Sequence, residues 1–80
     1  MFQVYILKSI KNEKHYIGHT GNLDDRLSRH NGGQVKSTKS SVPWDIVYTE
    51  TFNTKQEAYQ REFELKSYKG GIKFKKLFDC

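Results

Sequence analysis

The sequence has little cysteine or proline, one of each, and no long apolar run. Because its single cysteine is Cys80, no internal disulfide can form and no set of cysteines can hold zinc. The longest apolar run, Val4–Leu7, has 4 residues, whereas a bilayer-spanning helix needs about 20. The start MFQVYILK also lacks a basic segment ahead of its apolar stretch. We therefore expect no transmembrane or targeting segment, and a reducing, cytoplasmic location.

Positive charge dominates what is present. The 80 residues include 14 Lys+Arg and 9 Asp+Glu, a formal net charge of +5, and the pI is about 9.4. This balance favours a polyanionic partner such as nucleic acid. Hydrophobic residues make up 35% of the chain and aromatic residues 14%, enough for one modest core without disulfides. We expect residues 1–80 to form a single domain.

The periodicity of the chain predicts a β-hairpin from residues 2–7 and 15–18, followed by a helix over residues 22–30 capped by Asn22. The run Asn31-Gly32-Gly33 ends this helix, because Asn and Gly tolerate the left-handed conformation. A polar loop covers residues 34–42. A third strand, residues 44–52, alternates apolar residues on one side: Trp44, Ile46, Tyr48 and Phe52.

A second helix is predicted over residues 55–68, with Thr54 as its cap and Glu57 completing a capping box. A short basic segment after Gly70-Gly71 is the last predicted helix. The order ββαβαα is typical of an α+β fold, a small three-stranded antiparallel sheet flanked by helices.

Charged residues on the inward faces of the two helices are candidates for function, because a buried charge needs a partner. On the second helix, Glu62 lies within an apolar sector formed by Ala58, Leu65, Tyr59 and Phe63. It is a candidate acid or metal ligand. The alternative is a structural ion pair with Lys66 at i+4.

On the first helix, Arg26 and His30 share the side that carries Leu23 and Leu27. Their spacing lets them act on one ligand, and an arginine fork suits phosphate oxygens. The alternative is that Arg26 pairs with a carboxylate and His30 is a satisfied boundary residue. In the hairpin, Tyr5 and Tyr16 are placed to converge, although such tyrosines also serve packing.

Several segments in this order carry a family resemblance. VYIL (4–7), HYIGHT (15–20), NLDDRLSRHN (22–31), PWDIVYTETF (43–52) and EAYQREFELK (57–66) together resemble the GIY-YIG nuclease superfamily. The likeness is to its small stand-alone bacterial members, which are similar to the nuclease module of the excinuclease that acts in nucleotide excision repair. Gln3 stands where the family name has glycine. No asparagine follows Asn53, so the late asparagine of some members has no counterpart.

The resemblance implies an endonuclease that hydrolyses DNA phosphodiester bonds with one divalent cation. It implies Tyr5 as general base, Tyr16 orienting water or phosphate, and Arg26 on the non-bridging oxygens. His30 matches a histidine of many members, and Glu62 matches the residue that holds Mg²⁺ or Mn²⁺. For Tyr5 to act as a base, its pKa of about 10 must be lowered, by Arg26, the metal or a hydrogen bond to His30.

Nucleic-acid contacts are expected from Gly18, where a phosphate can approach the backbone, and from a set of cationic side chains: His19, Lys36, Lys39, Lys66 and Lys69. His19 stands where related modules carry lysine, and a purely solvent-exposed role is its alternative. With no appended base-reading module, selectivity would come from DNA shape, a protein partner or a weak homodimer formed through residues 74–78. A role in DNA repair, recombination or mobile-element biology would follow.

Two other functions are consistent with the fold and charge. The first is a non-catalytic nucleic-acid-binding module, which would bind DNA whatever residue stands at position 62. The second is a protein-interaction adaptor, which would show no salt-dependent affinity for DNA.

Overall fold

A computed structural model of the chain describes residues 1–36, 38–68 and 76. The elements follow in the order β1 (Phe2–Ser9), β2 (His15–Thr20), α1 (Leu23–Asn31), the short 3₁₀ helix η1 (Lys39–Ser41), β3 (Trp44–Phe52) and α2 (Lys55–Ser67). The predicted order is confirmed as far as α2. The last predicted helix, after Gly70-Gly71, lies outside the described residues apart from position 76.

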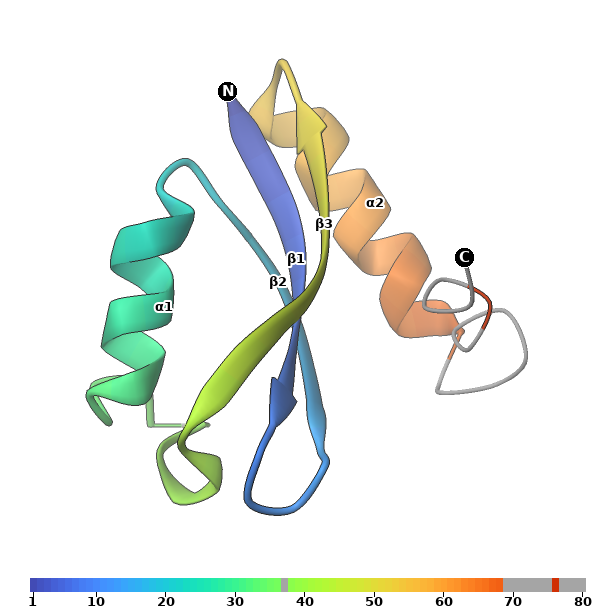
Figure 1. Ribbon diagram of the computed structural model, residues 1–80. Coiled ribbons are helices and arrows are strands. Elements are labelled where there is room, and N and C mark those ends of the chain that lie inside the picture. The colour runs from blue at the N-terminus through green and yellow to red at the C-terminus, as the bar shows by residue number, and fades with distance from the viewer. Residues whose placement is uncertain (37, 69–75, 77–80) are drawn as a thin grey trace.

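The strands form one antiparallel sheet with the order β2-β1-β3, so β1 is central and β2 is an edge. Helix α1 lies on one side of the sheet and α2 on the other (Figure 1). The prediction of a three-stranded antiparallel sheet flanked by helices is confirmed. In the described part of the chain, no helix has the length and apolar composition needed to cross a bilayer.

Alternation along β1 divides the core between the two sides of the sheet. Val4 and Ile6 pack with Ala58 and Leu65 of α2, and all four side chains are fully buried. The alternate residues Tyr5 and Leu7 pack with Trp44 on the side of α1, with Leu23 and Leu27 of that helix against them. A strand that is buried on both faces must be apolar at every position, as β1 is between Val4 and Leu7.

The prediction that β3 directs its apolar residues to one side is wrong. The pairing register shifts along the strand, with Tyr48 opposite Ile6 but Ile46 opposite Leu7, so Val47 is an extra residue in β3. This β-bulge reverses which side the following residues face. Trp44 and Ile46 therefore join the cluster beside α1, whereas Tyr48 and Phe52 join the cluster beside α2.

The apolar sector predicted for α2 is too wide. Ala58 and Leu65 are buried, but Tyr59 is 57% exposed and Phe63 is 69% exposed. Glu62 therefore lies at the rim of the buried face and not at its centre. The predicted cap is confirmed, because Thr54 Oγ1 accepts a hydrogen bond from the Glu57 amide at 3.2 Å and Thr54 donates to the Glu57 carboxylate at 3.0 Å.

Helix α1 begins as predicted and ends within the predicted run Asn31-Gly32-Gly33, one residue later than expected. The Asn22 side chain accepts from the Asp25 amide at 3.1 Å. Asn31 is still helical, Gly32 has right-handed backbone angles, and within this run Gly33 has the left-handed conformation, with φ of 75°. Asn31 instead ties the end of α1 to β3, because its amide group accepts from the Trp44 N–H at 2.6 Å and donates to the Trp44 carbonyl at 3.2 Å. This link fixes α1 against the sheet.

Candidate active site

Three aromatic rings from different elements meet beside the edge strand β2. Tyr5 comes from β1, Tyr16 from β2 and His30 from α1. The ring centroids of Tyr5 and Tyr16 are 6.3 Å apart, those of Tyr16 and His30 4.8 Å, and those of Tyr5 and His30 6.1 Å. The structure thus brings together three residues that sequence patterns place only on compatible faces.

The Tyr5 hydroxyl lies 3.3 Å from His30 Nε2, and both side chains are buried, Tyr5 at 1% exposure and His30 at 0%. Burial lowers the pKa of His30 below its usual value, and the positive charge of Arg26 lowers that pKa further. His30 is therefore a neutral imidazole at neutral pH, and a neutral imidazole has one nitrogen free to accept a proton.

The pKa of Tyr5 moves in the direction opposite to the one that a general base requires. Burial raises it far above its usual value, and the neighbouring Tyr16 and the negative charge of Glu62 add to the rise. Arg26 lowers this pKa, as expected, but burial outweighs it. The condition that the surroundings lower the pKa of Tyr5 is not met in the protein by itself, so Tyr5 is protonated and needs an acceptor for its proton.

Gly18 makes room for Tyr5. A Cβ atom added at Gly18 would lie 2.6 Å from the Tyr5 hydroxyl oxygen and 3.1 Å from Cε1 of Tyr16. Because real Cβ atoms do not approach other atoms so closely, the ring of Tyr5 lies across β2 only where the strand has a glycine. The space expected to admit a phosphate is therefore filled by the protein's own tyrosine.

Glu62 reaches the same strand from α2, on the other side of the sheet. Its Oε1 lies 2.7 Å from His19 Nδ1, and its Oε2 lies 2.9 Å from Lys66 Nζ. The side chain is 14% exposed. The structural pair with Lys66 is thus present, and so is a second partner, His19, that the sequence pattern does not reveal. The ring of Tyr59 makes an edge contact with His19, at 6.0 Å between centroids.

Arg26 and Glu62 act on Tyr5 with opposite signs, since Arg26 lowers the pKa of the phenol and Glu62 raises it. Arg26 is partly buried on α1, whereas Glu62 belongs to α2. The two helices lie on opposite sides of the sheet (Figure 1). Charges from both sides of the sheet therefore influence the Tyr5 hydroxyl.

The donor set at Glu62 fits a divalent cation only loosely. Among the described residues, no group of three His, Cys, Asp or Glu side chains could hold a metal. A hard cation such as Mg²⁺ is often bound by one or two carboxylates, with water and substrate oxygens in the other positions. Glu62 suits that kind of binding, but a cation would have to compete with His19 and Lys66 for its oxygens.

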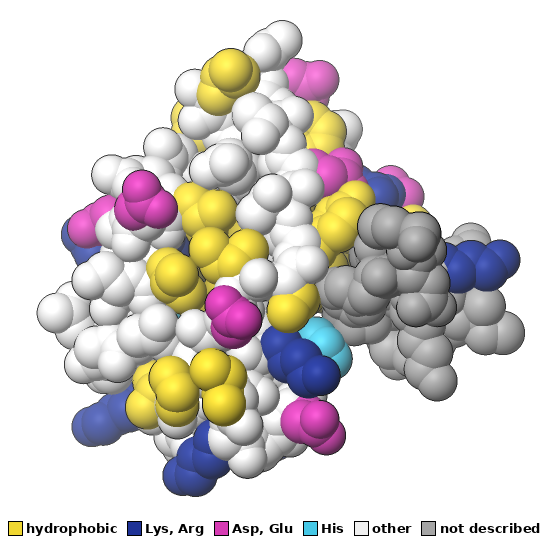
Figure 2. Space-filling view, viewed as in Figure 1, with side chains coloured by type: hydrophobic (Ala, Val, Ile, Leu, Met, Phe, Trp, Pro, Cys, Tyr) yellow, Lys and Arg dark blue, Asp and Glu magenta, His cyan; other side chains and the backbone are white. Residues whose placement is uncertain are grey.

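The predicted nucleic-acid contacts are dispersed. Lys36 and Lys39 are exposed in the segment after α1, Lys66 is half exposed, and Lys69 lies outside the described residues. His19 is mostly buried against Glu62, so it does not project into solvent. The face shown in Figure 2 carries cationic and acidic side chains side by side and, over the described residues, no continuous cationic patch.

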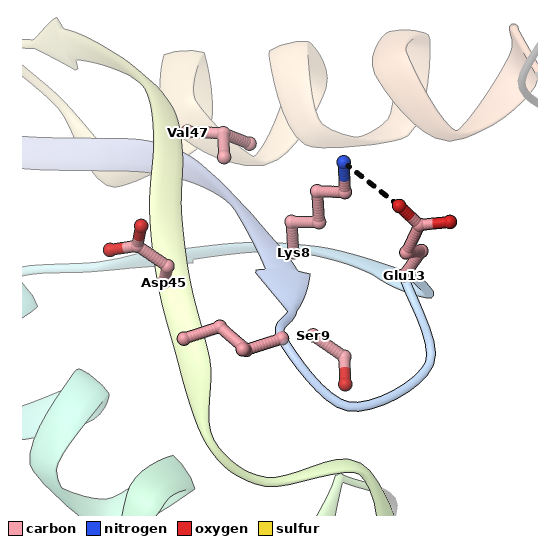
Figure 3. Close-up of a pocket in the computed structure, with 6 residues that line it drawn as sticks. Lys8, Ser9, Glu13, Asp45 and Val47 are labelled. Carbon is pink, nitrogen blue, oxygen red and sulfur yellow. Dashed lines mark ion pairs between the residues drawn. The ribbon is translucent and has the colours of Figure 1, made fainter.

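A shallow cavity of about 260 Å³ is separate from this site. Its lining is Lys8, Ser9, Ile10, Glu13, Asp45 and Val47 (Figure 3), none of them a candidate catalytic residue. Two of the lining side chains, Lys8 and Glu13, form a long ion pair, 3.8 Å between Nζ and Oε1, and both are substantially exposed. The cavity contributes nothing to the tyrosine and histidine cluster.

Sequence reasoning missed Thr38 and Tyr59. Thr38 belongs to a segment predicted only as a polar loop, yet its side chain is buried and its hydroxyl lies 2.8 Å from His30 Nδ1. No periodicity marks a single buried threonine in a loop. Tyr59 is predicted to join the core, although its spacing of three residues from Glu62 could have placed it beside the same site.

The fold and the order of the motifs define a small GIY-YIG domain. The family model described as the GIY-YIG catalytic domain matches residues 1–75. The chain therefore belongs to the GIY-YIG family. This is a family of nuclease domains, which implies a nucleic-acid substrate.

Within that family the chain belongs with the UPF0213 proteins. It is 40% identical to a UPF0213 protein of Staphylococcus haemolyticus over 75 residues, which cover 92% of this chain and 90% of the relative. It is 45% identical to one from Clostridium perfringens over 67 residues, covering 82% and 71% of the two chains. The solution NMR structure of a UPF0213 protein from Bacillus halodurans has 36% identity and a TM-score of 0.49, covering 84% of this chain and 72% of that one.

Proposed function

We propose that this protein is an endonuclease that hydrolyses DNA phosphodiester bonds with the help of a divalent cation. The observation that carries the proposal is the buried pair of the Tyr5 hydroxyl and His30 Nε2, flanked by the charges of Arg26 and Glu62. Membership of the GIY-YIG family supports the same conclusion.

Tyr5 and His30 act together as the base. Because burial keeps Tyr5 protonated, it cannot take a proton from water unless it gives up its own. His30 is neutral and lies within hydrogen-bond distance. Tyr5 therefore passes a proton on as it receives one, and the pair avoids forming a buried phenolate before the reaction.

Arg26 provides the positive charge for the phosphate. A guanidinium group can hold two non-bridging oxygens at once and stabilises the charge that develops in the transition state. Tyr16, stacked on Tyr5 and close to His30, orients the attacking water or the phosphate. Exposed Lys36 and Lys39 contact the DNA backbone beyond the reacting bond.

Glu62 is the residue that would hold Mg²⁺ or Mn²⁺. When bound, the cation would supply positive charge near the leaving oxygen. In its absence, His19 and Lys66 keep the carboxylate in place at the edge of the sheet. The two interactions hold the carboxylate ready without a cage of protein ligands, so we expect weak cation binding until the substrate contributes its own oxygens.

The decisive experiment is conversion of supercoiled plasmid to open circles by wild type and by Glu62→Gln, each with Mg²⁺, Mn²⁺ or EDTA. Glutamine keeps the shape of the side chain and removes its charge. Glu57→Gln is the matched control, because it changes another carboxylate of α2 and glutamine also completes a capping box. We expect conversion by wild type and Glu57→Gln only with metal, and none by Glu62→Gln.

The alternative of a non-catalytic binding module predicts a different outcome. Wild type and Glu62→Gln would then bind plasmid equally, with affinity that falls as salt rises, and neither would nick plasmid or branched DNA. Equal nicking by wild type and Glu62→Gln would show instead that Glu62 is not the metal residue.

A further inference from the structure

Thr38 completes a buried hydrogen-bonded chain behind Tyr5. Its Oγ1 lies 2.8 Å from His30 Nδ1 and 3.3 Å from the carbonyl oxygen of Val35. Its own carbonyl accepts from the Trp44 indole N–H at 3.0 Å. Thr38 is 1% exposed. The Thr38 hydroxyl is therefore held between the Val35 carbonyl and His30 Nδ1, the ring nitrogen that faces away from Tyr5.

The positions of the protons in this chain follow from counting donors. The threonine hydroxyl has one proton, and a carbonyl oxygen can only accept. If Thr38 donates to Val35, its oxygen accepts from His30, so His30 carries its proton on Nδ1. Nε2 is then free to accept from the Tyr5 hydroxyl, and every contact in the chain is a hydrogen bond.

The opposite arrangement leaves a buried group without a partner. If Thr38 donated to Nδ1, the His30 proton would lie on Nε2 and point at the Tyr5 oxygen. The Tyr5 proton would then have no acceptor, because in the described part of the chain His30 Nε2 is its hydrogen-bond partner. A buried hydroxyl without an acceptor costs about 1–3 kcal/mol. The structure satisfies all its buried side-chain polar atoms within the described residues, which favours the first arrangement.

We propose that Thr38 is a positioning residue that holds His30 in the tautomer protonated on Nδ1, so that Nε2 receives the proton of Tyr5 during phosphodiester cleavage. The proposal rests on the proposed nuclease function for its consequence in catalysis. Its structural part, the tautomer of His30, can be tested without any measurement of activity. Thr38 does not touch the reacting atoms, and it acts only through His30.

Protons and bonds balance in this step. Water gives one proton to the Tyr5 oxygen while the Tyr5 hydroxyl proton moves to His30 Nε2, and the water oxygen forms a bond to phosphorus. The bond from phosphorus to the leaving oxygen breaks, and that oxygen takes a proton from solvent. His30 becomes an imidazolium whose Nδ1–H still donates to Thr38. Reversal of the relay returns its proton to solvent through Tyr5.

The tautomer can be read from long-range ¹H–¹⁵N NMR spectra of the ¹⁵N-labelled protein, in which protonated and unprotonated ring nitrogens have distinct shifts. The His30 signals are assigned by their loss in His30→Gln. We expect His30 to be protonated on Nδ1 in wild type and in Thr38→Ser. In Thr38→Val, which has nearly the same shape but no hydroxyl, we expect the Nε2 tautomer to increase.

Cleavage measurements with the same variants test the consequence. We expect kcat to fall about 100-fold in Thr38→Val, with KM unchanged, and Thr38→Ser to retain most activity. Thr51→Val, an exposed threonine on β3, should behave as wild type. Thermal unfolding and amide spectra establish that each variant is folded.

Several results would overturn the proposal. An Nε2-protonated His30 in wild type refutes it without any variant, which covers the case that Thr38→Val does not fold. An unchanged tautomer or unchanged kcat in a folded Thr38→Val does the same. If no substrate is cleaved by wild type although His30 is protonated on Nδ1, the nuclease function fails and the proton relay fails with it, while the positioning of His30 by Thr38 is supported by the spectrum alone.

Discussion

Alternate residues of β1 face the two sides of the sheet, and the two sides differ in how polar their buried groups are. On the side of α2, Val4 and Ile6 pack against Ala58 and Leu65 in an apolar cluster. On the side of α1, Tyr5 continues into a chain of polar groups through His30 to Thr38. The buried part of the α2 side is therefore apolar, whereas the α1 side combines an apolar cluster around Leu7 and Trp44 with buried hydrogen bonds.

This difference shows how a small domain can hold a polar relay. A buried polar group costs free energy unless it is paired, and a partly satisfied network is worse than an apolar one. Within the described residues every buried side-chain nitrogen and oxygen has a partner. The apolar cluster beside α2 stabilises the fold, and the bulge at Val47 lets β3 contribute apolar residues to both sides.

The largest expected effect is on activity, and it follows from removing one oxygen on the side of α1. Tyr5→Phe keeps the ring that fills the space over Gly18 and removes the hydroxyl that donates to His30. We expect plasmid cleavage to fall about 1,000-fold, within the usual range for loss of a general base. The free energy of unfolding should fall by about 1–3 kcal/mol, because the buried Nε2 of His30 loses its hydrogen-bond partner.

The matched control is Tyr48→Phe, which removes a tyrosine hydroxyl from the cluster beside α2. Single-turnover cleavage rates for both variants decide the result. Similar losses in the two variants would mean that the hydroxyls serve structure, and that the relay is not a distinct feature of the α1 side.

The second prediction concerns the side of α2, where we expect a loss of stability and not of chemistry. Leu65→Ala removes a fully buried side chain and should lower the free energy of unfolding by about 3 kcal/mol. Urea unfolding measures this change. At a temperature where the variant remains folded, its cleavage rate should be close to that of wild type.

Phe63→Ala is the control for that change. Phe63 is on the same helix but 69% exposed, so its truncation should alter the free energy of unfolding by about 0.5 kcal/mol or less. If Phe63→Ala were as destabilising as Leu65→Ala, the buried face of α2 would be as wide as the helical periodicity predicts.

The sequence was informative where a pattern repeats along an element. Periodicity placed β3 at its observed bounds and Thr54 at the start of α2, because alternation and capping are local properties. It failed at Val47, where one extra residue reversed the strand, and at Phe63, because a helical wheel ranks side chains by polarity and does not show which neighbour covers them. Thr38 could not be found at all, since its role depends on a contact with His30 that only the tertiary fold creates.

The smallest expected effect is a loss of stability at low pH that originates at His30, on the side of α1. The folded protein lowers the pKa of His30 below its usual value through burial and Arg26, so the unfolded chain binds a proton more readily than the native one. The free energy of unfolding is then level above about pH 6.5 and falls as the pH drops below it. The pKa of His15 is also lowered, by burial and Lys8, and this shift contributes to the decrease with the same sign.

Urea unfolding at pH 7.5 and 5.5 measures this decrease in the free energy of unfolding. We expect most of the decrease to remain in His15→Gln and most of it to be lost in His30→Gln. Retention of the full decrease in His30→Gln would mean that the relay on the side of α1 does not hold a neutral imidazole, and the contrast between the two sides would then lie in packing alone.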